Sequence, residues 1–269
     1  MLNNSTPYLL LLVCTLLVFT TPGCEQIEPP DTSEFTLQDE VKLGQELQEA
    51  VTRNSAEYPL LDENNYANLY AYANGLLDEL IQTGNIEHIN NGFDWSVKII
   101  QDDASESAFT LPGGPIYMSS GLLKYLVSEH EFLALLAHEM AYADRSLVKN
   151  FLADEFGLTV LLDVSLGSNP EIADTLLDLI ANSTYPKAIT KQADEYSVAL
   201  VCHTDYLPDG LLDILERAQS MPSLNLDWLN KRPGDNDRQV NIEDLISDLN
   251  CSGVNEGTNN YAEFLSLLP

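Results

Sequence analysis

The chain has 269 residues and a formal net charge of −30, because 42 acidic residues stand against 12 basic ones. A surface this acidic repels nucleic acid, whose phosphates bind clustered Lys and Arg, and it repels anionic lipid unless a separate anchor holds the protein there. Hydrophobic residues make up 45% of the chain, which is enough for a packed core and excludes global disorder. The excess of acid indicates either a strongly solvated surface or a face for a cationic partner, and we expect the solvated surface.

The N-terminus has the pattern of an export signal. The first 23 residues carry no charge, residues 8–21 are nearly all apolar, and Thr21-Pro22-Gly23-Cys24 follows. This run is too short to span a bilayer comfortably but suits the core of a signal peptide. Small residues before a cysteine resemble a bacterial lipoprotein signal, so we expect residues 1–23 to be removed, Cys24 to be lipidated and residues 24–36 to form a tether. The alternative is ordinary secretion with cleavage nearby. Both predict an exported protein, and the lipoprotein signal predicts a membrane anchor in the bacterial cell envelope.

Residues 37–269 are expected to form one α+β domain, mainly helical with a small sheet. Apolar residues at helical spacing predict the helices, and the β-branched residues of 95–100 predict a strand. The stretch 108–145 indicates an extended segment, a Pro-Gly-Gly turn, a second extended segment, a short helix and a long apolar helix. The other predicted helices cover residues 37–54, 64–84, 146–164, 171–182, 187–201, 210–219 and 241–249.

The long apolar helix ends in His138-Glu139-Met140-Ala141-Tyr142, one residue away from the zinc-peptidase motif HExxH. Residues four apart on a helix lie on the same face, so the two histidines of that motif hold one zinc ion. The glutamate after the first histidine activates the zinc-bound water. A bare His-Glu pair is also a common coincidence on a helix, so the surrounding segments decide its meaning.

Several of those segments resemble, in the right order, the HtpX-like and CAAX-prenyl-protease-like zinc metallopeptidases of metallopeptidase family 48, especially the exported bacterial lipoproteins. The matching segments are EVKLGQEL, WSVKII, SAFTLPGGPIYMSSGLL, LALLAHEMA, ADEYSVALV and RPGDNDR. The resemblance covers nearly the whole mature chain. It implies a gluzincin-type fold, in which a small twisted sheet packs on the metal-binding helix and further helices enclose both.

The resemblance assigns roles to residues of the central helix. His138 matches the first zinc ligand and Glu139 matches the general base. Tyr142 occupies the position of the second ligand histidine. Tyrosine binds metal only as phenolate, and its ordinary pKa near 10 makes that form costly. The motif therefore retains the base but lacks one ligand.

A second ligand position is also changed. The third ligand of the family is a glutamate four residues before the aspartate of an Ala-Asp pair, which here is Ala193-Asp194, so the position falls on Thr190. Asp194 matches the acidic residue that supports a ligand histidine from behind. A His-Pro pair in a later loop of the family is Arg232-Pro233 here. The resemblance thus implies zinc as the cofactor of the family, bound weakly or not at all by this chain.

Two further features bear on function. In the family, the segment corresponding to Leu111, Pro112, Gly113 and Gly114 lies on an edge strand that holds an unfolded or extended polypeptide by β-augmentation. The alternative is an ordinary buried hairpin. Two cysteines, Cys202 and Cys251, remain after Cys14 and Cys24, and in an exported domain they indicate a disulfide, with two free thiols as the alternative.

The sequence therefore favours a pseudopeptidase: an exported lipoprotein that acts by binding peptides or proteins in envelope protein quality control. The alternative is an active zinc metalloendopeptidase with an altered site and Glu139 as general base. A third hypothesis is a structural lipoprotein that binds no peptide. Replacing both altered positions, Tyr142→His with Thr190→Glu, is expected to restore tight zinc binding.

Overall fold

The computed structural model describes residues 35–269 except residues 90, 222–225 and 235–236. These residues belong to one compact unit that spans Thr32–Pro269. The predicted signal peptide, Cys24 and most of the tether lie outside the described residues. Within the described part of the chain, no helix is long and apolar enough to cross a membrane.

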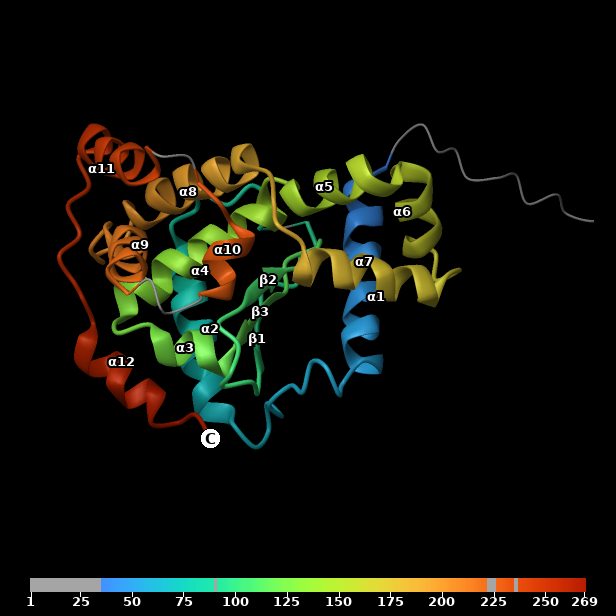
Figure 1. Cartoon of the computed structure of the whole chain (residues 1–269), viewed down its shortest axis with the longest axis horizontal. Helices are drawn as coiled ribbons and strands as arrows, with labels where there is room; N and C mark the ends of the chain where they lie inside the picture. The colour runs from blue at the N-terminus through green and yellow to red at the C-terminus, as the bar shows by residue number, and fades with distance from the viewer. Residues whose placement is uncertain (1–34, 90, 222–225, 235–236) are drawn as a thin grey trace, which may run out of the picture. The chain divides into compact units, whose positions relative to one another are not determined.

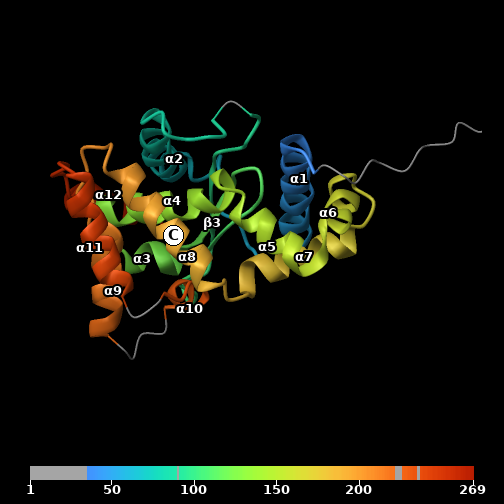
Figure 2. The ribbon, with the colours of Figure 1, turned by 90° about the horizontal axis from the view of Figure 1, so that it is seen from above.

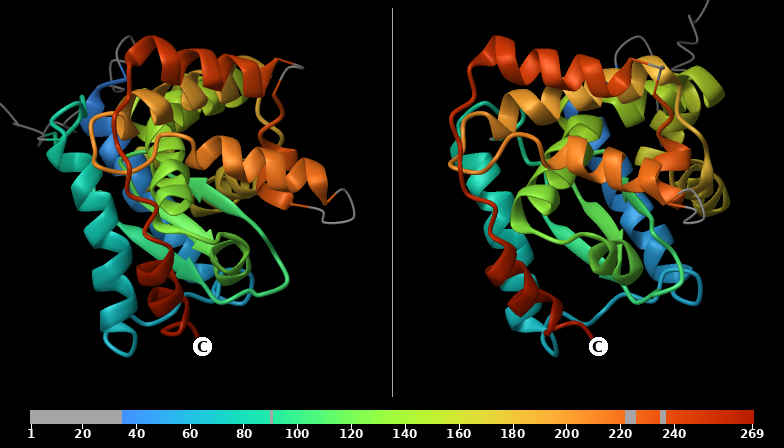
Figure 3. Two further views of the ribbon diagram at one scale, coloured as in Figure 1. Left: turned by 90° about the vertical axis from the view of Figure 1, so that its left-hand side faces the viewer. Right: turned by 60° about the vertical axis from the view of Figure 1, so that its left-hand side comes forward.

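The long apolar helix of the sequence is α4, Glu129–Asp144, and every one of its residues is buried. Its N-cap is Ser128, whose side-chain oxygen accepts from the backbone N–H of Glu131. Helix α8, Lys187–Val201, packs against α4. The sheet lies on the other side of α4 from α8 (Figure 3). A helix covered on both sides needs apolar residues all round, which residues 132–137 provide, while the buried charged residues nearer its two ends need polar partners.

The sheet has three strands: β1, Val97–Ile100; β2, Ala108–Thr110; and β3, Ile116–Ser119. Strand β3 lies in the middle, parallel to β1 and antiparallel to β2. The strand predicted from residue 95 begins two residues later. Val97 pairs with Ile116, and the carbonyl oxygen of Ser96 still accepts from the N–H of Ile116 at 2.9 Å, so backbone pairing reaches one residue before the strand.

The Pro-Gly-Gly turn between β2 and β3 lies beneath α1, Leu37–Arg53. Gly113 and Gly114 have φ values of 81° and 114°, which favour glycine. Gly44 of α1 meets the turn so closely that a Cβ atom there would lie 1.9 Å from the carbonyl oxygen of Pro112. Glycines on both sides therefore let α1 pack directly on the turn.

The remaining helices enclose this centre (Figure 1). At one end, α1 packs with α6 and α7 and lies near α5, and α9, α11 and α12 lie at the other end (Figure 2). The single helix predicted over 146–164 is wrong, because Gly157, with φ 83°, divides it into α5 and α6. The bounds are α2 Ala67–Gln82, α3 Ser120–Tyr125, α5 Leu147–Phe156, α6 Leu158–Ser165, α7 Pro170–Asn182, α9 Gly210–Ser220, α10 Asp227–Lys231, α11 Arg238–Leu249 and α12 Thr258–Leu265.

The fold class predicted from the sequence is confirmed: the chain is mainly helical with a small three-stranded sheet. A disulfide joins Cys202, at the end of α8, to Cys251, just beyond α11, with 4.8 Å between their Cα atoms. The two cysteines are 49 residues apart in the chain. The bridge therefore holds the helix that carries Asp194 to the C-terminal part of the domain.

Helix α1 contains a carboxyl group whose burial gives a pH dependence. The side chain of Glu40 is 2% exposed, and its Oε2 accepts from the hydroxyl of Ser146 at 2.9 Å. Burial raises the pKa of Glu40 to about 7, against the opposing effects of Ser146 and Lys149. The ordinary pKa of this carboxyl group is 4.5. Between pH 4.5 and about pH 7, the folded protein therefore holds a proton that the unfolded chain has released. Stability is lost as pH rises through that window.

We expect Glu40→Gln to raise the free energy of unfolding by about 2 to 3 kcal/mol at pH 8 and to change it little at pH 4.5, because glutamine keeps the hydrogen bond to Ser146 without a buried charge. Urea denaturation at the two pH values measures the difference. Glu49→Gln, on the exposed side of the same helix, is the matched control and should show no such pH dependence. An equal gain for Glu40→Gln at both pH values would contradict the assignment.

Candidate functional site

The site predicted from the sequence lies where α4 and α8 pack together. His138, Glu139 and Tyr142 are on α4, and Thr190 and Asp194 are on α8. All five side chains are buried, and those of His138, Glu139 and Thr190 are 0% exposed. The structure adds residues that the sequence did not assign to the site: Thr110 of β2, Tyr185, Trp228 of α10, Arg232 and Arg238.

Both carboxylate oxygens of Glu139 are engaged by other side chains. Oε1 lies 2.9 Å from Nε of Arg232 and accepts from the indole N–H of Trp228 at 2.8 Å. Oε2 accepts from Nη2 of Arg232 at 3.1 Å and from the hydroxyl of Thr110 at 3.0 Å. The guanidinium thus faces both oxygens: Nη2 donates a hydrogen bond to Oε2, while Nε lies at ion-pair distance from Oε1 without hydrogen-bond geometry.

The guanidinium of Arg232 is enclosed on its other sides as well. Its central carbon lies 4.8 Å from the ring centroid of Tyr142 and 5.1 Å from that of Tyr185, both cation–π distances. Nη2 also donates to the backbone oxygen of Ala108 at 3.1 Å. Burial lowers the pKa of Arg232, but the charge of Glu139 outweighs it and holds the pKa above its ordinary value. The site therefore contains a permanent positive charge, supplied by the chain itself.

A second ion pair lies behind His138. This pair joins Asp194 and Arg238: the two carboxylate oxygens of Asp194 accept from Nε and Nη2 of Arg238 at 2.7 and 2.8 Å. Oδ1 of Asp194 also lies 3.1 Å from Nδ1 of His138. Burial lowers the pKa of His138, which keeps the imidazole neutral. Burial raises the pKa of Asp194, but His138 and Arg238 outweigh it and hold that pKa below its ordinary value. Arg238 also donates to the carbonyl oxygen of Arg232 at 2.8 Å, which links the two ion pairs.

Apart from Nδ1 of His138, which lies 3.1 Å from Asp194 without hydrogen-bond geometry, three polar atoms at the ligand positions have no hydrogen-bond partner among the described residues. They are Nε2 of His138, the hydroxyl of Tyr142 and Oγ1 of Thr190. Burial raises the pKa of Tyr142, so the phenol stays protonated. These atoms are the donor set that a metal at this position would meet: one neutral imidazole, one neutral phenol and one hydroxyl.

This donor set does not fit a catalytic zinc. Structural and catalytic zinc sites use imidazole, thiolate and carboxylate ligands, and a catalytic site has three of them. Here only His138 is of that kind, because the carboxylate of Glu139 is paired with Arg232. The positive charge of the guanidinium, buried beside the same histidine helix, further opposes a divalent cation. The buried arginine is thus a second obstacle to zinc, independent of the two changed ligands.

The predicted substrate segment has a different environment from that expected. Leu111, Pro112, Gly113 and Gly114 form the buried turn beneath α1. The outer edge of β2 is covered by the segment that contains α10. The backbone N–H of Trp228 donates to the carbonyl oxygen of Glu106 at 2.7 Å, and Nη2 of Arg232 donates to the carbonyl oxygen of Ala108. An added strand along β2 would therefore have to displace the segment that contains α10.

We expect Tyr142→Phe to leave the free energy of unfolding unchanged or to raise it by up to about 1 kcal/mol, because its buried hydroxyl has no partner to lose. The matched control is Tyr261→Phe, which removes a buried hydroxyl that donates to the carbonyl oxygen of Leu123 at 2.7 Å. That control should lose about 1 to 2 kcal/mol. Equal losses for the two variants in urea denaturation would mean that the Tyr142 hydroxyl has a partner.

A His-Glu pair on a buried helix, packed between a small sheet and a helix that supplies an aspartate to the histidine, defines a metallopeptidase-like fold. The chain belongs to peptidase family M48, whose family model matches residues 67–246. It is similar to the mitochondrial metalloendopeptidase OMA1 of Saccharomyces cerevisiae, with 23% identity over 194 residues. That match covers 66% of this chain and 55% of the relative, so the chain spans little more than half the length of that protein. The M48 family is zinc-dependent, which makes the donor set described above a departure from the family.

Proposed function

We propose that this chain is a catalytically silent member of family M48 that binds polypeptides and does not cleave them. The observation that carries the proposal is the pairing of Glu139 with Arg232. A general base needs a carboxylate oxygen within hydrogen-bond reach of the water that it activates. Each oxygen of Glu139 already has two partners in a fully buried site.

The pairing also gives Glu139 a structural role that explains its retention. A buried carboxylate without a partner is strongly destabilising, and a buried arginine without one is equally so. Glu139 and Arg232 neutralise each other, while Tyr142 and Tyr185 supply aromatic faces for the guanidinium. The catalytic glutamate of the family is in this chain the counter-ion of an internal cation.

The proposed ligand is an unfolded or extended polypeptide. A surface hollow of about 160 Å³ lies beside the start of β2, and its lining includes Ser105, Ser107, Phe109, Asp227 and Lys231. The hollow offers polar side chains from the segment before β2 and from α10, and these can bind the polar groups of an extended polypeptide without adding a strand to β2. We further propose that the protein is exported, is anchored to the bacterial cell envelope through lipidated Cys24 and acts in protein quality control there. Its strong negative charge argues against nucleic acid as a partner.

The proposal is tested by incubating the purified protein with a fluorescently labelled unfolded polypeptide, with and without added zinc. We expect no cleavage by the wild-type chain or by Glu139→Gln, while fluorescence anisotropy shows binding. Lys231→Glu, which reverses a charge in the hollow, should weaken binding, whereas Lys191→Glu on α8 is the matched control and should not. Chelator-sensitive cleavage that disappears in Glu139→Gln would refute the proposal.

One observation favours the competing hypothesis of an active endopeptidase with an altered site. The side chains at all three ligand positions have buried polar atoms without partners among the described residues. Activity would require Arg232 to withdraw from Glu139 and the carboxylate to face a water. The cleavage assay with Glu139→Gln decides between the two hypotheses.

A further inference from the structure

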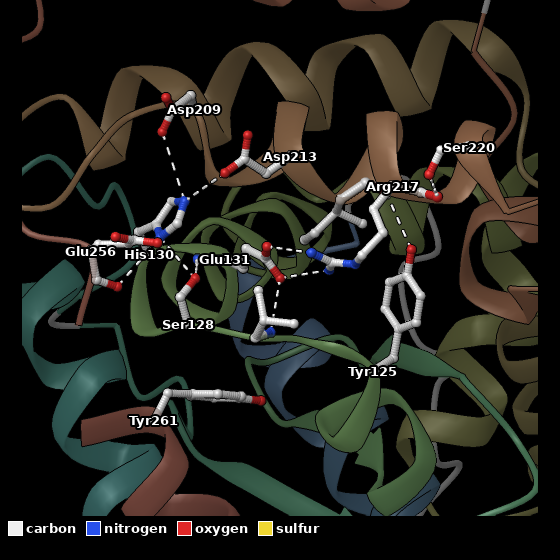
Figure 4. A network of polar contacts seen from close by, with 12 residues as sticks. Tyr125, Ser128, His130, Glu131, Asp209, Asp213, Arg217, Ser220, Glu256 and Tyr261 are labelled. Atoms are coloured by element: carbon white, nitrogen blue, oxygen red, sulfur yellow. Dashed lines mark hydrogen bonds and ion pairs between the residues drawn. The ribbon is translucent and has the colours of Figure 1, made fainter. Parts of the chain in front are cut away.

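The first turn of α4 carries a second group of metal-ligating side chains, away from the site around His138. His130 is 2% exposed, and Figure 4 shows its ring directed at the start of α9. Its Nε2 lies 3.0 Å from Oδ2 of Asp213 and 3.8 Å from Oδ1 of Asp209. One ligand atom from each residue fits within 4.8 Å of the other two. The three residues thus converge on one point.

The two ring nitrogens of His130 have different partners. Nδ1 lies 2.8 Å from Oγ of Ser128 and 3.3 Å from the backbone carbonyl oxygen of Glu256, which only accepts hydrogen bonds. Without a cation, Nε2–H donates to Oδ2 of Asp213 at 3.0 Å and Nδ1 accepts from Ser128. With a cation, the proton moves to Nδ1, which donates to the carbonyl of Glu256, and the lone pair of Nε2 is directed at the space between the two carboxylates. Metal-binding histidines are held in this way, with the second nitrogen donating to a carbonyl.

Asp209 supplies an independent observation. Its side chain is 42% exposed, yet its Oδ1 is buried and has no hydrogen-bond partner among the described residues. Asp209 is the N-cap residue of α9 but makes no capping hydrogen bond through its side chain. An aspartate at this position normally accepts from the first turn of its own helix. Here Oδ1 is directed at His130, so a buried oxygen lacks a donor where a cation would satisfy it.

The fold brings these residues together through a glycine. Gly210 follows Asp209 and lies against α4 so closely that a Cβ atom would be 2.3 Å from the carbonyl oxygen of His130. The residues open into a surface hollow of about 400 Å³ that Glu216 and Glu256 also line. Arg217 lines it too, but its guanidinium is held by Glu131 through two contacts of 2.6 Å. The hollow therefore presents a negative, solvent-accessible mouth.

We propose that His130, Asp209 and Asp213 bind a divalent cation of the zinc type, at a site that is separate from the altered family centre. One imidazole and two carboxylates are a ligand set that zinc uses, whereas calcium and magnesium prefer oxygen ligands alone. Ligands about 2.1 Å from a tetrahedral ion lie roughly 3.4 Å apart, and the distances from His130 Nε2 to Oδ2 of Asp213 and Oδ1 of Asp209 are 3.0 and 3.8 Å. The cation would join α9 to α4, and the hollow leaves its fourth position open to water.

The test is calorimetric titration of the full protein with zinc chloride near neutral pH. We expect saturable binding of one ion, weakened by more than about tenfold in Asp209→Asn and in Asp213→Asn. Asp209 and Asp213 are both partly exposed, so these variants should keep the fold, which far-UV circular dichroism verifies. The midpoint of thermal unfolding gives a second readout. Zinc should raise it in the wild-type chain and not in the two variants.

Two matched controls locate the site. Glu216→Gln removes a carboxylate from the same hollow that is not among the three ligands, and His138→Gln removes the retained histidine of the family centre. Both should bind zinc as the wild-type chain does. The proposal would be overturned if the wild-type chain showed no saturable binding, if Asp213→Asn bound zinc normally, or if Glu216→Gln lost affinity as much as Asp213→Asn. Loss of binding in His138→Gln alone would assign the ion to the family centre instead.

Discussion

Replacing Arg232 with methionine should lower the free energy of unfolding by about 3 to 5 kcal/mol. Methionine fills much of the space of the arginine side chain but leaves the carboxylate of Glu139, which is 0% exposed, without its counter-charge. The cost arises from that unpaired charge and not from lost volume. Urea denaturation of the two proteins measures it.

The double variant Glu139→Gln with Arg232→Met is the decisive control. It removes both charges, so most of the lost stability should return, which a double-mutant cycle reports as a coupling energy. Arg53→Met, which breaks a half-exposed pair with Asp174, should cost less than about 1 kcal/mol. If Arg232→Met were as mild as Arg53→Met, the two residues would not form the buried pair on which the proposed function rests.

The second large effect concerns zinc. The sequence alone predicts that Tyr142→His with Thr190→Glu restores tight binding. The structure changes that prediction, because Arg232 would still occupy Glu139 and keep a positive charge at the site. We now expect the two-residue variant to remain without zinc at this centre. Adding Arg232→His, which restores the His-Pro pattern of the family at Arg232-Pro233, should raise the zinc content by about one equivalent per chain.

Elemental analysis after dialysis against a weak chelator measures this difference. The reference is the wild-type chain treated in the same way, so any ion held by His130 is subtracted. The variant Arg232→His alone is the matched control, and it should gain no zinc because both missing ligands are still absent. A two-residue variant that bound zinc as well as the three-residue variant would show that Arg232 is no obstacle.

The sequence predicted the fold well because its signals are local. The apolar run of residues 132–137 in α4, the Pro-Gly-Gly turn and the helical spacing of α1 and α8 each arise from residues close in the chain, and the structure has these elements where they were expected. The errors are local too: Gly157 divides the helix predicted over 146–164, and β1 begins two residues later than predicted. Helices α10 and α12 are short and were not predicted.

The site was only partly predictable, because its main feature joins residues 93 positions apart. The changed ligands Tyr142 and Thr190 could be identified from motif positions, and so could His138 and Glu139. Arg232 was noticed as a departure from a His-Pro pattern, yet its pairing with Glu139 depends on how the segment after α10 folds back onto β2. A lone arginine in a loop is usually solvated, and nothing in its neighbours indicates burial. Its burial is a tertiary property.

The same reasoning applies to the proposed second metal site. His130 lies two helical turns before His138, and from the sequence it offers no help to the family centre. Its partners Asp209 and Asp213 come from a helix that begins about 80 residues later in the chain, and the close approach depends on Gly210. Only the packing of α9 on α4 places the three side chains together.

The pairing of Glu139 with Arg232 is the central claim, and a crystal grown with zinc and measured at the zinc absorption edge tests it most directly. We predict electron density for the guanidinium between Glu139, Tyr142 and Tyr185, and no anomalous peak within bonding distance of Nε2 of His138. A peak at His130 would bear on the separate site and not on this claim. An anomalous peak at Nε2 of His138, with Arg232 displaced from Glu139, would contradict the account.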